Sequence, residues 1–297
     1  MEELGVLDGT PYSLPHDAAT DLRRLEWLTA DIRAKVTTAA RKAEGMGLLR
    51  QIRLEQNYRV VYESNALEFE GPDLAGTVRA ITSRTGQDIV QTLNTNLLPE
   101  ILKRDPKAYA AIGLESARVL SESYIDHQRS VLASDVRSLH AMIMAGTWHA
   151  GRYRPHDVKL KDAVHLPPAH YKVPAEMQEL VEWKSSCVEE SPILRAAVAH
   201  AWLGHIHPFK DGNGRVARLL TNVMLGQAGL PPAIVKASSQ RTKYLNALAH
   251  SDEGGDLLPL AGLFADTLHR YASDMEKPRL LPQAVRRPDC SSWHLAL

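Results

Sequence analysis

The sequence predicts an all-α protein with one short β-hairpin. Apolar residues recur at three- and four-residue steps along most of the chain, which is typical of amphipathic helices. Glycine and proline interrupt these segments where helices are expected to end. Between Val158 and Leu166 the pattern changes to an alternation of apolar and polar residues around Lys161 and Asp162, which indicates a hairpin. The expected fold is therefore a helical bundle with a single hairpin.

Six helices are expected before the hairpin. Their ranges are about 21–42, 48–70, 74–83, 88–103, 107–126 and 134–145. In the first of them, Leu25, Leu28 and Ile32 share one face. The second is expected to end at Glu70, because a glycine and a proline follow it directly.

Five helices are expected after the hairpin. Their ranges are about 175–187, 192–205, 213–228, 238–250 and 257–276. Ser191 and Pro192 open the second of these as its N-cap and first helical residue. The third begins at Asn213, so these two helices flank a loop centred on His207 to Gly212.

Composition restricts the class of protein. The 297 residues carry 35 basic and 35 acidic side chains, so a general polyanion binder with a basic surface is not expected. Two cysteines, Cys187 and Cys290, are too few for a disulfide framework. The acidic N-terminus does not resemble a signal peptide, and no segment approaches the roughly 18 apolar residues of a membrane span. These features favour a cytoplasmic protein that binds neither a membrane nor nucleic acid.

The segment HPFKDGNGRVAR, from His207 onward, concentrates residues suited to phosphate chemistry. Gly212 and Gly214 lie where a helix begins, so backbone N–H groups can converge on an anion at its positive end. Arg215 and Arg218 are three residues apart, share a helix face and can bind further phosphate oxygens. The segment therefore predicts a phosphate-binding site.

Two further side chains of the segment add chemistry to this site. Asp211 is a hard oxygen ligand suited to Mg²⁺ held jointly with phosphates. His207, with an ordinary pKa of about 6.5, can accept a proton at neutral pH. The alternative is a glycine-rich turn with solvated arginines, which would account for each residue singly but not for the whole set.

This segment matches the Fic motif HxFx(D/E)GNGRxxR at every defined position, and the chain resembles the Fic family. The similarity covers about residues 134–270 and includes GRYRPHDVKL, HLPP and RLLTNVMLGQAGLPP. It implies an all-helical Fic fold in which the hairpin is a flap that docks a target segment. It also implies transfer of AMP from ATP to a Ser, Thr or Tyr hydroxyl of a target protein.

The resemblance assigns roles to individual residues. His207 would be the general base, and Asp211 would hold Mg²⁺, with Mn²⁺ as an alternative. Glycine at 214, where phosphorylating members have lysine, favours nucleotidyl transfer. The residues expected to bind the nucleotide are Lys210, Gly212, Asn213, Gly214, Arg215, Arg218, Tyr244 and Asn246. Within this group the three residues 212–214 would form the anion hole, the arginines would bind the β- and γ-phosphates, and the last two would line the adenine pocket.

The segment from Ser64 to Glu68 resembles the inhibitory (S/T)xxxE(G/N) motif of class II Fic proteins. Phe69 replaces the usual glycine or asparagine, and Glu70 offers a competing glutamate that lacks the serine four residues before it. Ser64 and Glu68 share a helix face. The resemblance implies that Glu68 pairs with Arg218 in the place of the ATP γ-phosphate. The alternative is a solvated acidic helix end.

Three regions are expected. They are an N-terminal helical region over 1–95 with the inhibitory helix near 52–71, a Fic catalytic domain over 96–276, and a loosely ordered tail over 277–297. The expected function is an autoinhibited protein adenylyltransferase that uses ATP and Mg²⁺, acts on a target protein and forms a homodimer by family resemblance.

Several alternatives remain open at this point. In some relatives the same glutamate aligns a water that removes AMP, so the chain could be a deAMPylase. A nucleotide sensor without transfer, a metal-dependent phosphohydrolase and a phosphocholine transferase are further alternatives. A zinc site built from His200, His205 and His207 is not favoured, because neither an HExxH motif nor a cysteine pair accompanies them. His200 and His205 are instead expected to pack between helices.

Overall fold

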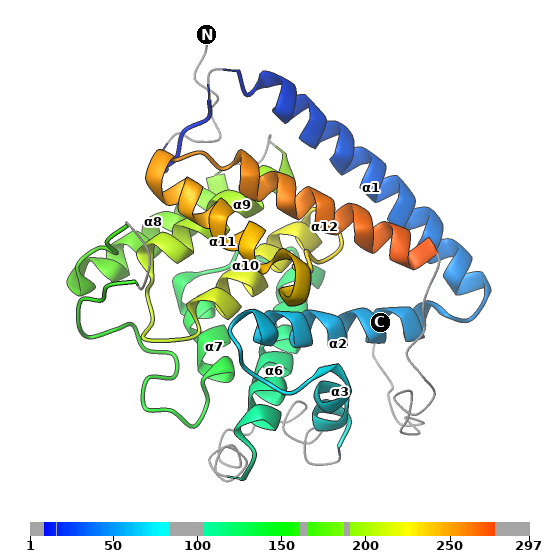
Figure 1. Cartoon of the computed structure of the whole chain (residues 1–297), viewed down its shortest axis with the longest axis horizontal. Coiled ribbons are helices and arrows are strands. Elements are labelled where there is room, and N and C mark those ends of the chain that lie inside the picture. Colours follow the sequence, from blue (N-terminus) through cyan, green and yellow to red (C-terminus); the bar gives the residue numbers. More distant parts are fainter. Residues whose placement is uncertain (1–8, 16, 84–103, 161–164, 187–190, 277–297) are drawn as a thin grey trace.

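The structure, a computed structural model, describes residues 9–15, 17–83, 104–160, 165–186 and 191–276. The all-α class predicted from the sequence is confirmed (Figure 1). The helices are α1 (Ala19–Gly45), α2 (Leu49–Leu67), α3 (Leu74–Thr82), α6 (Pro106–Asp126), α7 (Ala133–Ile143), the short 3₁₀ helix η3 (His170–Lys172), α8 (Val173–Ser186), α9 (Pro192–Ile206), α10 (Asn213–Gln227), α11 (Ala237–Gly254) and α12 (Leu258–Glu276). In the described ranges, β-pairing is limited to one bridge between Ser13 and Asp256.

Helices α9 and α10 lie at the centre of the molecule. Helix α9 is apolar on almost every face, as expected of a helix that is covered on all sides. Helix α10 packs against α9 and also touches α6, α7 and α2. The loop that is predicted to bind phosphate joins α9 to α10, so its two ends are fixed by well-packed helices of the core.

The N-terminal helices belong to the same core. Helix α1 lies beside α12 along one edge of the molecule, and α2 crosses the fold between α11 and α3 (Figure 1). Leu25 and Ile32 of α1 and Val61 and Leu67 of α2 join the hydrophobic cluster that contains α9 and α10. The end of α2 is therefore held against the centre of the fold. The domain boundary predicted near residue 95 falls outside the described residues.

Helix α2 ends at Leu67, three residues before the predicted end at Glu70. The Glu70 N–H donates to the carbonyl of Asn65 at 2.9 Å, and the Phe69 N–H donates to the carbonyl of Ala66 at 3.1 Å. These two bonds form a Schellman motif, in which the residue after the C-cap adopts a left-handed conformation. That residue is Phe69, whose φ is +57°.

The predicted β-hairpin is not seen. Residues 151–160 and 165–169 form no strand, and residues 161–164 lie outside the described part of the chain. The described residues are instead tied to the α9–α10 loop by side chains that bind main-chain carbonyls, Arg154 above all.

Other expectations cannot be compared with the structure. The helix predicted over 88–103, the tail over 277–297, Cys187 and Cys290 lie outside the described residues. Among the helices that are described, none is both long and apolar enough to cross a membrane.

The contact between α1 and α12 gives a test of the shared core. Ile32 is fully buried on α1, so Ile32→Ala should lower the free energy of unfolding by about 2–5 kcal/mol. Trp27→Ala is the control on the same helix, because Trp27 is 64% exposed and its removal should change stability by less than about 0.5 kcal/mol. Urea denaturation measures both. An Ile32→Ala protein as stable as the control would show that α1 packs elsewhere.

Candidate active site

The loop between α9 and α10 depends on two left-handed residues. His207 follows α9 with φ +48°, and its N–H donates to the carbonyl of Leu203 at 3.0 Å. Gly212 precedes α10 with φ +79°. A Cβ at position 212 would lie 3.2–3.3 Å from Met144 and His140, so both the conformation and the space favour glycine. The loop is thus bent sharply at each end.

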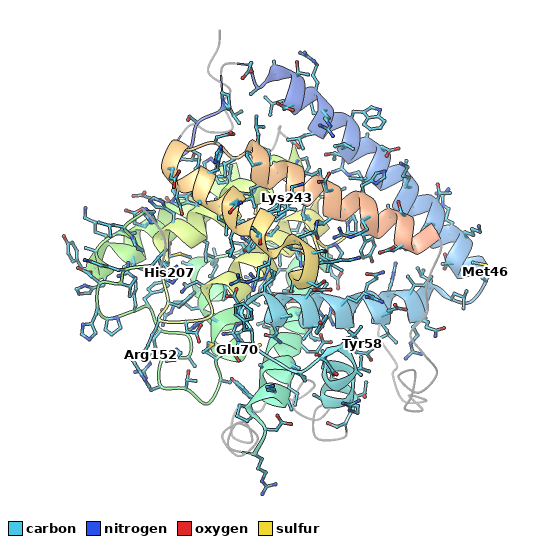
Figure 2. All side chains as sticks on the ribbon, in the orientation of Figure 1. Met46, Tyr58, Glu70, Arg152, His207 and Lys243 are labelled. Carbon is cyan, nitrogen blue, oxygen red and sulfur yellow. The ribbon has the colours of Figure 1, made fainter. Side chains whose placement is uncertain are left out.

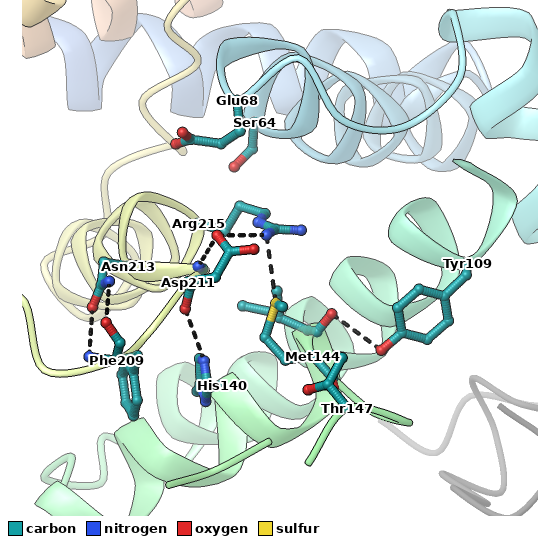
Figure 3. Close-up of polar contacts among 12 residues, drawn as sticks. Ser64, Glu68, Tyr109, His140, Met144, Thr147, Phe209, Asp211, Asn213 and Arg215 are labelled. Atoms are coloured by element: carbon teal, nitrogen blue, oxygen red, sulfur yellow. Dashed lines mark hydrogen bonds and ion pairs between the residues drawn. The ribbon is translucent and has the colours of Figure 1, made fainter. Parts of the chain in front are cut away.

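The side chain of Asn213 closes the loop on itself. Its Oδ1 accepts from the N–H of Phe209 and its Nδ2 donates to the carbonyl of Phe209, both at 2.9 Å (Figure 3). The Phe209 ring is fully buried and stacks on His140 with 3.8 Å between ring centroids. One donor and one lone pair of the Asn213 side chain are used in this way, and its main-chain N–H lies at the start of α10, where the anion hole is predicted.

His140 of α7 holds the loop at Asp211. Its Nδ1 accepts from the N–H of Gly151 at 2.9 Å, so in the neutral ring Nε2 carries the hydrogen and donates to the Asp211 carbonyl at 3.0 Å. Burial lowers the pKa of His140 to about 4, which keeps the ring neutral. Sequence reasoning missed this residue. The only available signal was a histidine on the buried face of a predicted helix, which does not reveal what the ring contacts.

Arg154 holds the other end of the loop. The buried guanidinium donates from Nε to the His207 carbonyl at 2.9 Å, from Nη1 to the His156 carbonyl at 3.0 Å and from Nη2 to the Pro168 carbonyl. The Arg154 N–H also donates to the carbonyl of Pro208 at 2.9 Å. Arg154 was likewise missed, because an arginine in a polar loop usually signals exposure.

The electrostatic surroundings keep His207 neutral. Burial is the main reason that the pKa of His207 lies below its ordinary value, and the nearby Arg154 cation lowers the pKa further. A hydrogen bond to the Gly204 main chain and the charge of Glu68 act in the opposite direction, but the net shift is downward. At neutral pH the ring can therefore accept a proton, as a general base must.

Arg215 is a buried cation with little to neutralise it. Its Nη2 lies 3.5 Å from Asp211 Oδ1 and 3.4 Å from the Met144 sulfur, while Nε is buried with no partner among the described residues (Figure 3). An unpaired buried donor on a charged group is unfavourable, so the site suits an added anion. The Asp211 carboxylate is 60% exposed beside it and could bind a divalent cation.

Arg218 is fully enclosed by residues of other helices. Its Nε donates to Ser64 Oγ at 2.9 Å, and its Nη2 donates to the Ser64 carbonyl and to Glu68 Oε1, each at 2.8 Å. Its Nη1 donates to Tyr244 Oη at 3.3 Å. The structure therefore brings together Ser64, Glu68 and Arg218.

Glu68, and not Glu70, is the glutamate at the loop. The Glu70 side chain is exposed at the end of α2, at the edge of the site (Figure 2). The Glu68 carboxylate contacts Arg218 and lies so close to Gly214 that a Cβ at 214 would overlap Oε1. It thus occupies the point where Arg218 meets the N-terminal turn of α10, whose free N–H groups attract anions.

Comparison with known proteins identifies the domain that contains this loop. Residues 130–225 match the family model described as Fic/DOC family. The chain carries a Fic domain. The segment 207–218 is its Fic motif, and α2 lies outside the matched residues.

Relatives extend the similarity beyond the matched domain. The Protein adenylyltransferase Fic of Nematostella vectensis is 32% identical over 67% of this chain and 44% of its own length. The protein of the same name from Drosophila melanogaster is 30% identical over 93% of this chain and 54% of its own length. The chain thus spans about half the length of these curated relatives.

Solved structures share the fold. Fic-1 of C. elegans (residues 134–508) is 24% identical with a TM-score of 0.67, over 88% of this chain and 74% of that one. A Fic-domain signaling protein from Bacteroides thetaiotaomicron is 20% identical with a TM-score of 0.65, over 83% of this chain and 96% of that one.

Three predicted nucleotide-binding residues lie in different surroundings. Lys210 of the Fic motif is exposed, with Nζ 4.9 Å from the centroid of the Trp148 ring. Tyr244 is buried against Arg218. Asn246 lies two residues further along α11, about 200° around the helix, and lines a groove between α11, α1 and α12 instead of the loop. The structure does not bring Asn246 to the Fic motif.

The three histidines considered for zinc do not converge. His200 packs between helices, as expected. His205 stacks on His165 with 3.6 Å between centroids and lies 3.4 Å from Asp252. His165, His205 and Asp252 offer ligand atoms within 4.8 Å of one another. The two histidine rings are stacked, however, so the lone pairs of their ring nitrogens lie in nearly parallel planes and do not point toward one ion.

The overlap at Gly214 gives a test of the Glu68 position. Gly214→Ala should lower the free energy of unfolding by about 1–3 kcal/mol, because the new methyl group displaces the Glu68 carboxylate from Arg218. In a Glu68→Gly background the loss should be smaller, because only the 3.1 Å approach of the new Cβ to Arg218 Nη1 remains. Unfolding measurements on the four proteins give the coupling between the two sites.

A second glycine serves as the control. Gly204 of α9 has open space around its Cβ position, so Gly204→Ala should be neutral or stabilising by up to about 1 kcal/mol in both backgrounds. An equal loss for Gly214→Ala with and without Glu68 would contradict the contact.

Proposed function

We propose that this chain transfers AMP from ATP to a hydroxyl side chain of a target protein, and that Glu68 holds it inactive. The observation that carries the proposal is the Glu68 carboxylate on Arg218, beside the first turn of α10. A site that already holds one anion at this point suits a terminal phosphate of a nucleotide. The relatives described above, which are named protein adenylyltransferases, support the same reaction.

The proposed reaction assigns a task to each group of the Fic motif. Neutral His207 takes the proton of the target hydroxyl as its oxygen bonds to the α-phosphorus. The bond from the α-phosphorus to the β-phosphate bridging oxygen breaks, and pyrophosphate leaves. Arg215 and the N–H groups of residues 213 and 214 would face the phosphate oxygens, where their charge and dipoles oppose the developing negative charge, while the Gly212 N–H donates to Asp211 Oδ1.

The residues present also fit a metal ion. Asp211 would hold Mg²⁺, or Mn²⁺ in its place, through an exposed carboxylate whose main chain is fixed by His140. When bound, the ion supplies positive charge to the phosphates. The orphaned Nε of buried Arg215 is consistent with a site that is completed by an anionic ligand.

Inhibition follows from competition for Arg218. While Glu68 accepts from Nη2, the same N–H cannot bind a phosphate oxygen, and the carboxylate repels that phosphate. A nucleotide can still bind with its terminal phosphates elsewhere, but its α-phosphorus is then not aligned with His207. A homodimer and a cytoplasmic location stay predictions from the sequence.

Removal of AMP is the second candidate. Glu68 is 38% exposed beside the first turn of α10, so a water can reach its carboxylate at the end of the loop that carries His207. Release of AMP from an AMP-modified protein by the wild type, but not by Glu68→Gly, would favour this direction.

Labelling with α-labelled ATP and Mg²⁺ tests the proposal. Glu68→Gly should incorporate AMP well above the wild type, because Arg218 becomes available to phosphate. Glu70→Gly is the matched control on the same helix end and should behave like the wild type. Adding His207→Ala to Glu68→Gly should reduce the rate more than about a hundredfold. ATP binding without labelling in any of these proteins would leave a nucleotide sensor as the better description.

The lowered pKa of His207 predicts the pH dependence of transfer. Its ordinary pKa is 6.5, and burial lowers this value, so the active neutral ring persists to more acidic pH. In Glu68→Gly, kcat/KM should stay constant on the acid side down to a pH below 6.5 and then fall as His207 gains a proton. An acid limb that begins above pH 6.5 would contradict the assignment of the base.

A further inference from the structure

A continuous chain of buried hydrogen bonds leads away from Arg218. Tyr244 Oη of α11 lies 3.3 Å from Arg218 Nη1 and 2.8 Å from His200 Nε2. His200 Nδ1 of α9 lies 2.8 Å from Thr221 Oγ1, which donates to the Ala217 carbonyl at 2.8 Å. Each residue in this chain is at most 5% exposed. The proposed reaction assigns no task to Tyr244, His200 or Thr221.

The direction of every bond in this chain can be worked out. A carbonyl oxygen only accepts, so the Thr221 hydroxyl hydrogen goes to Ala217 and Thr221 Oγ1 must accept from His200 Nδ1–H. In a neutral ring, Nε2 then has no hydrogen and accepts from the Tyr244 hydroxyl. The Tyr244 oxygen therefore turns its lone pairs toward Arg218, which only donates.

Burial maintains these protonation states. It lowers the pKa of His200 to about 3, and the nearby Arg218 cation lowers the pKa further. Burial also raises the pKa of Tyr244, so its hydroxyl stays protonated. The direction of the chain is thus the same throughout the neutral range.

We propose that Tyr244 is a positioning residue that holds the Arg218 guanidinium in its phosphate-binding position, with its hydroxyl oriented by His200 and Thr221. The proposal rests on the proposed function, in which Arg218 binds the β- and γ-phosphates. It replaces the adenine-pocket role expected for Tyr244 from the sequence.

The contact between Tyr244 and Arg218 comes from a different helix than the contacts of Ser64 and Glu68 with Arg218. The other partners of Arg218 are Ser64 and Glu68, both on α2. Tyr244 lies on α11, which is also packed against α9 and α12, so its contact with Arg218 does not depend on Glu68. Arg218 therefore stays oriented when Glu68 withdraws, and the nucleotide does not have to order a free side chain on binding.

The test compares ATP with AMP in the Glu68→Gly background. Tyr244→Phe removes the acceptor and keeps the ring, so the Kd for ATP should rise roughly tenfold, as expected for one hydrogen bond to a charged group. The Kd for AMP should not change, because AMP has no β- or γ-phosphate. Titration calorimetry measures the Kd for ATP and the Kd for AMP directly. In the transfer assay, the KM for ATP should rise while kcat changes little.

Two further variants complete the design. Thr221→Val keeps the shape but removes the hydroxyl acceptor of His200 Nδ1–H and leaves it only the Ala217 carbonyl, which weakens the preference for the tautomer whose Nε2 accepts from Tyr244. It should weaken ATP binding in the same selective way without touching Tyr244 or Arg218. Tyr124→Phe is the control, since this buried tyrosine contacts Arg129 far from the Fic motif and its loss should affect neither nucleotide.

The outcomes separate the two proposals. Equal weakening of ATP and AMP would assign Tyr244 to the adenine pocket or to general stability and would overturn the positioning role, as would an unchanged Kd for ATP. If Glu68→Gly transfers no AMP, the proposed function fails, yet selective loss of ATP binding would still support the contact. If Tyr244→Phe does not fold, Thr221→Val decides the question in the same assay.

Discussion

The buried guanidinium of Arg218 is the constraint on which the site depends. A charge that is 5% exposed must be neutralised and fully hydrogen-bonded, or it destabilises the fold by several kcal/mol. Ser64 and Glu68 supply acceptors from α2, about 150 positions away in the sequence, and Tyr244 supplies one from α11. The proposed inhibition and the stability of this region therefore depend on the same contact between Glu68 and Arg218. An event that removes Glu68 must bring another anion to Arg218, and the terminal phosphates of a nucleotide meet that need.

The loop owes its shape to residues that take no part in the proposed chemistry. His140, Arg154 and Asn213 use their polar atoms almost entirely on main-chain carbonyl and N–H groups of the loop and its surroundings. Because these residues satisfy the backbone, the His207 ring and the Asp211 carboxylate are free to act on a ligand. This division explains how a loop with two left-handed residues keeps one conformation between two well-packed helices.

Local sequence patterns predicted the helices, the loop between α9 and α10, and the shared face of Ser64 and Glu68. Each depends on the spacing of neighbouring residues, which the sequence displays directly. The contacts of His140, Arg154 and Tyr244 depend on segments that are distant in the sequence, so spacing holds no information about them. The hairpin is not seen in residues 151–160 and 165–169, where Arg154 and His165 instead bind the carbonyls of His207 and His205, which are also distant in the sequence.

The end of α2 shows why the position after Glu68 usually holds glycine or asparagine. The Schellman motif requires a positive φ at this position, and for Phe69 this conformation costs about 1–2 kcal/mol. Arg241 offsets part of the strain, since its guanidinium lies 4.4 Å from the centroid of the Phe69 ring and its Nε donates to the Leu67 carbonyl at 3.1 Å. A cation–π contact at so exposed a ring contributes only about 0.5–1 kcal/mol. The turn that presents Glu68 therefore depends on contacts from outside α2, which are those of Arg241 and the ion pair between Glu68 and Arg218.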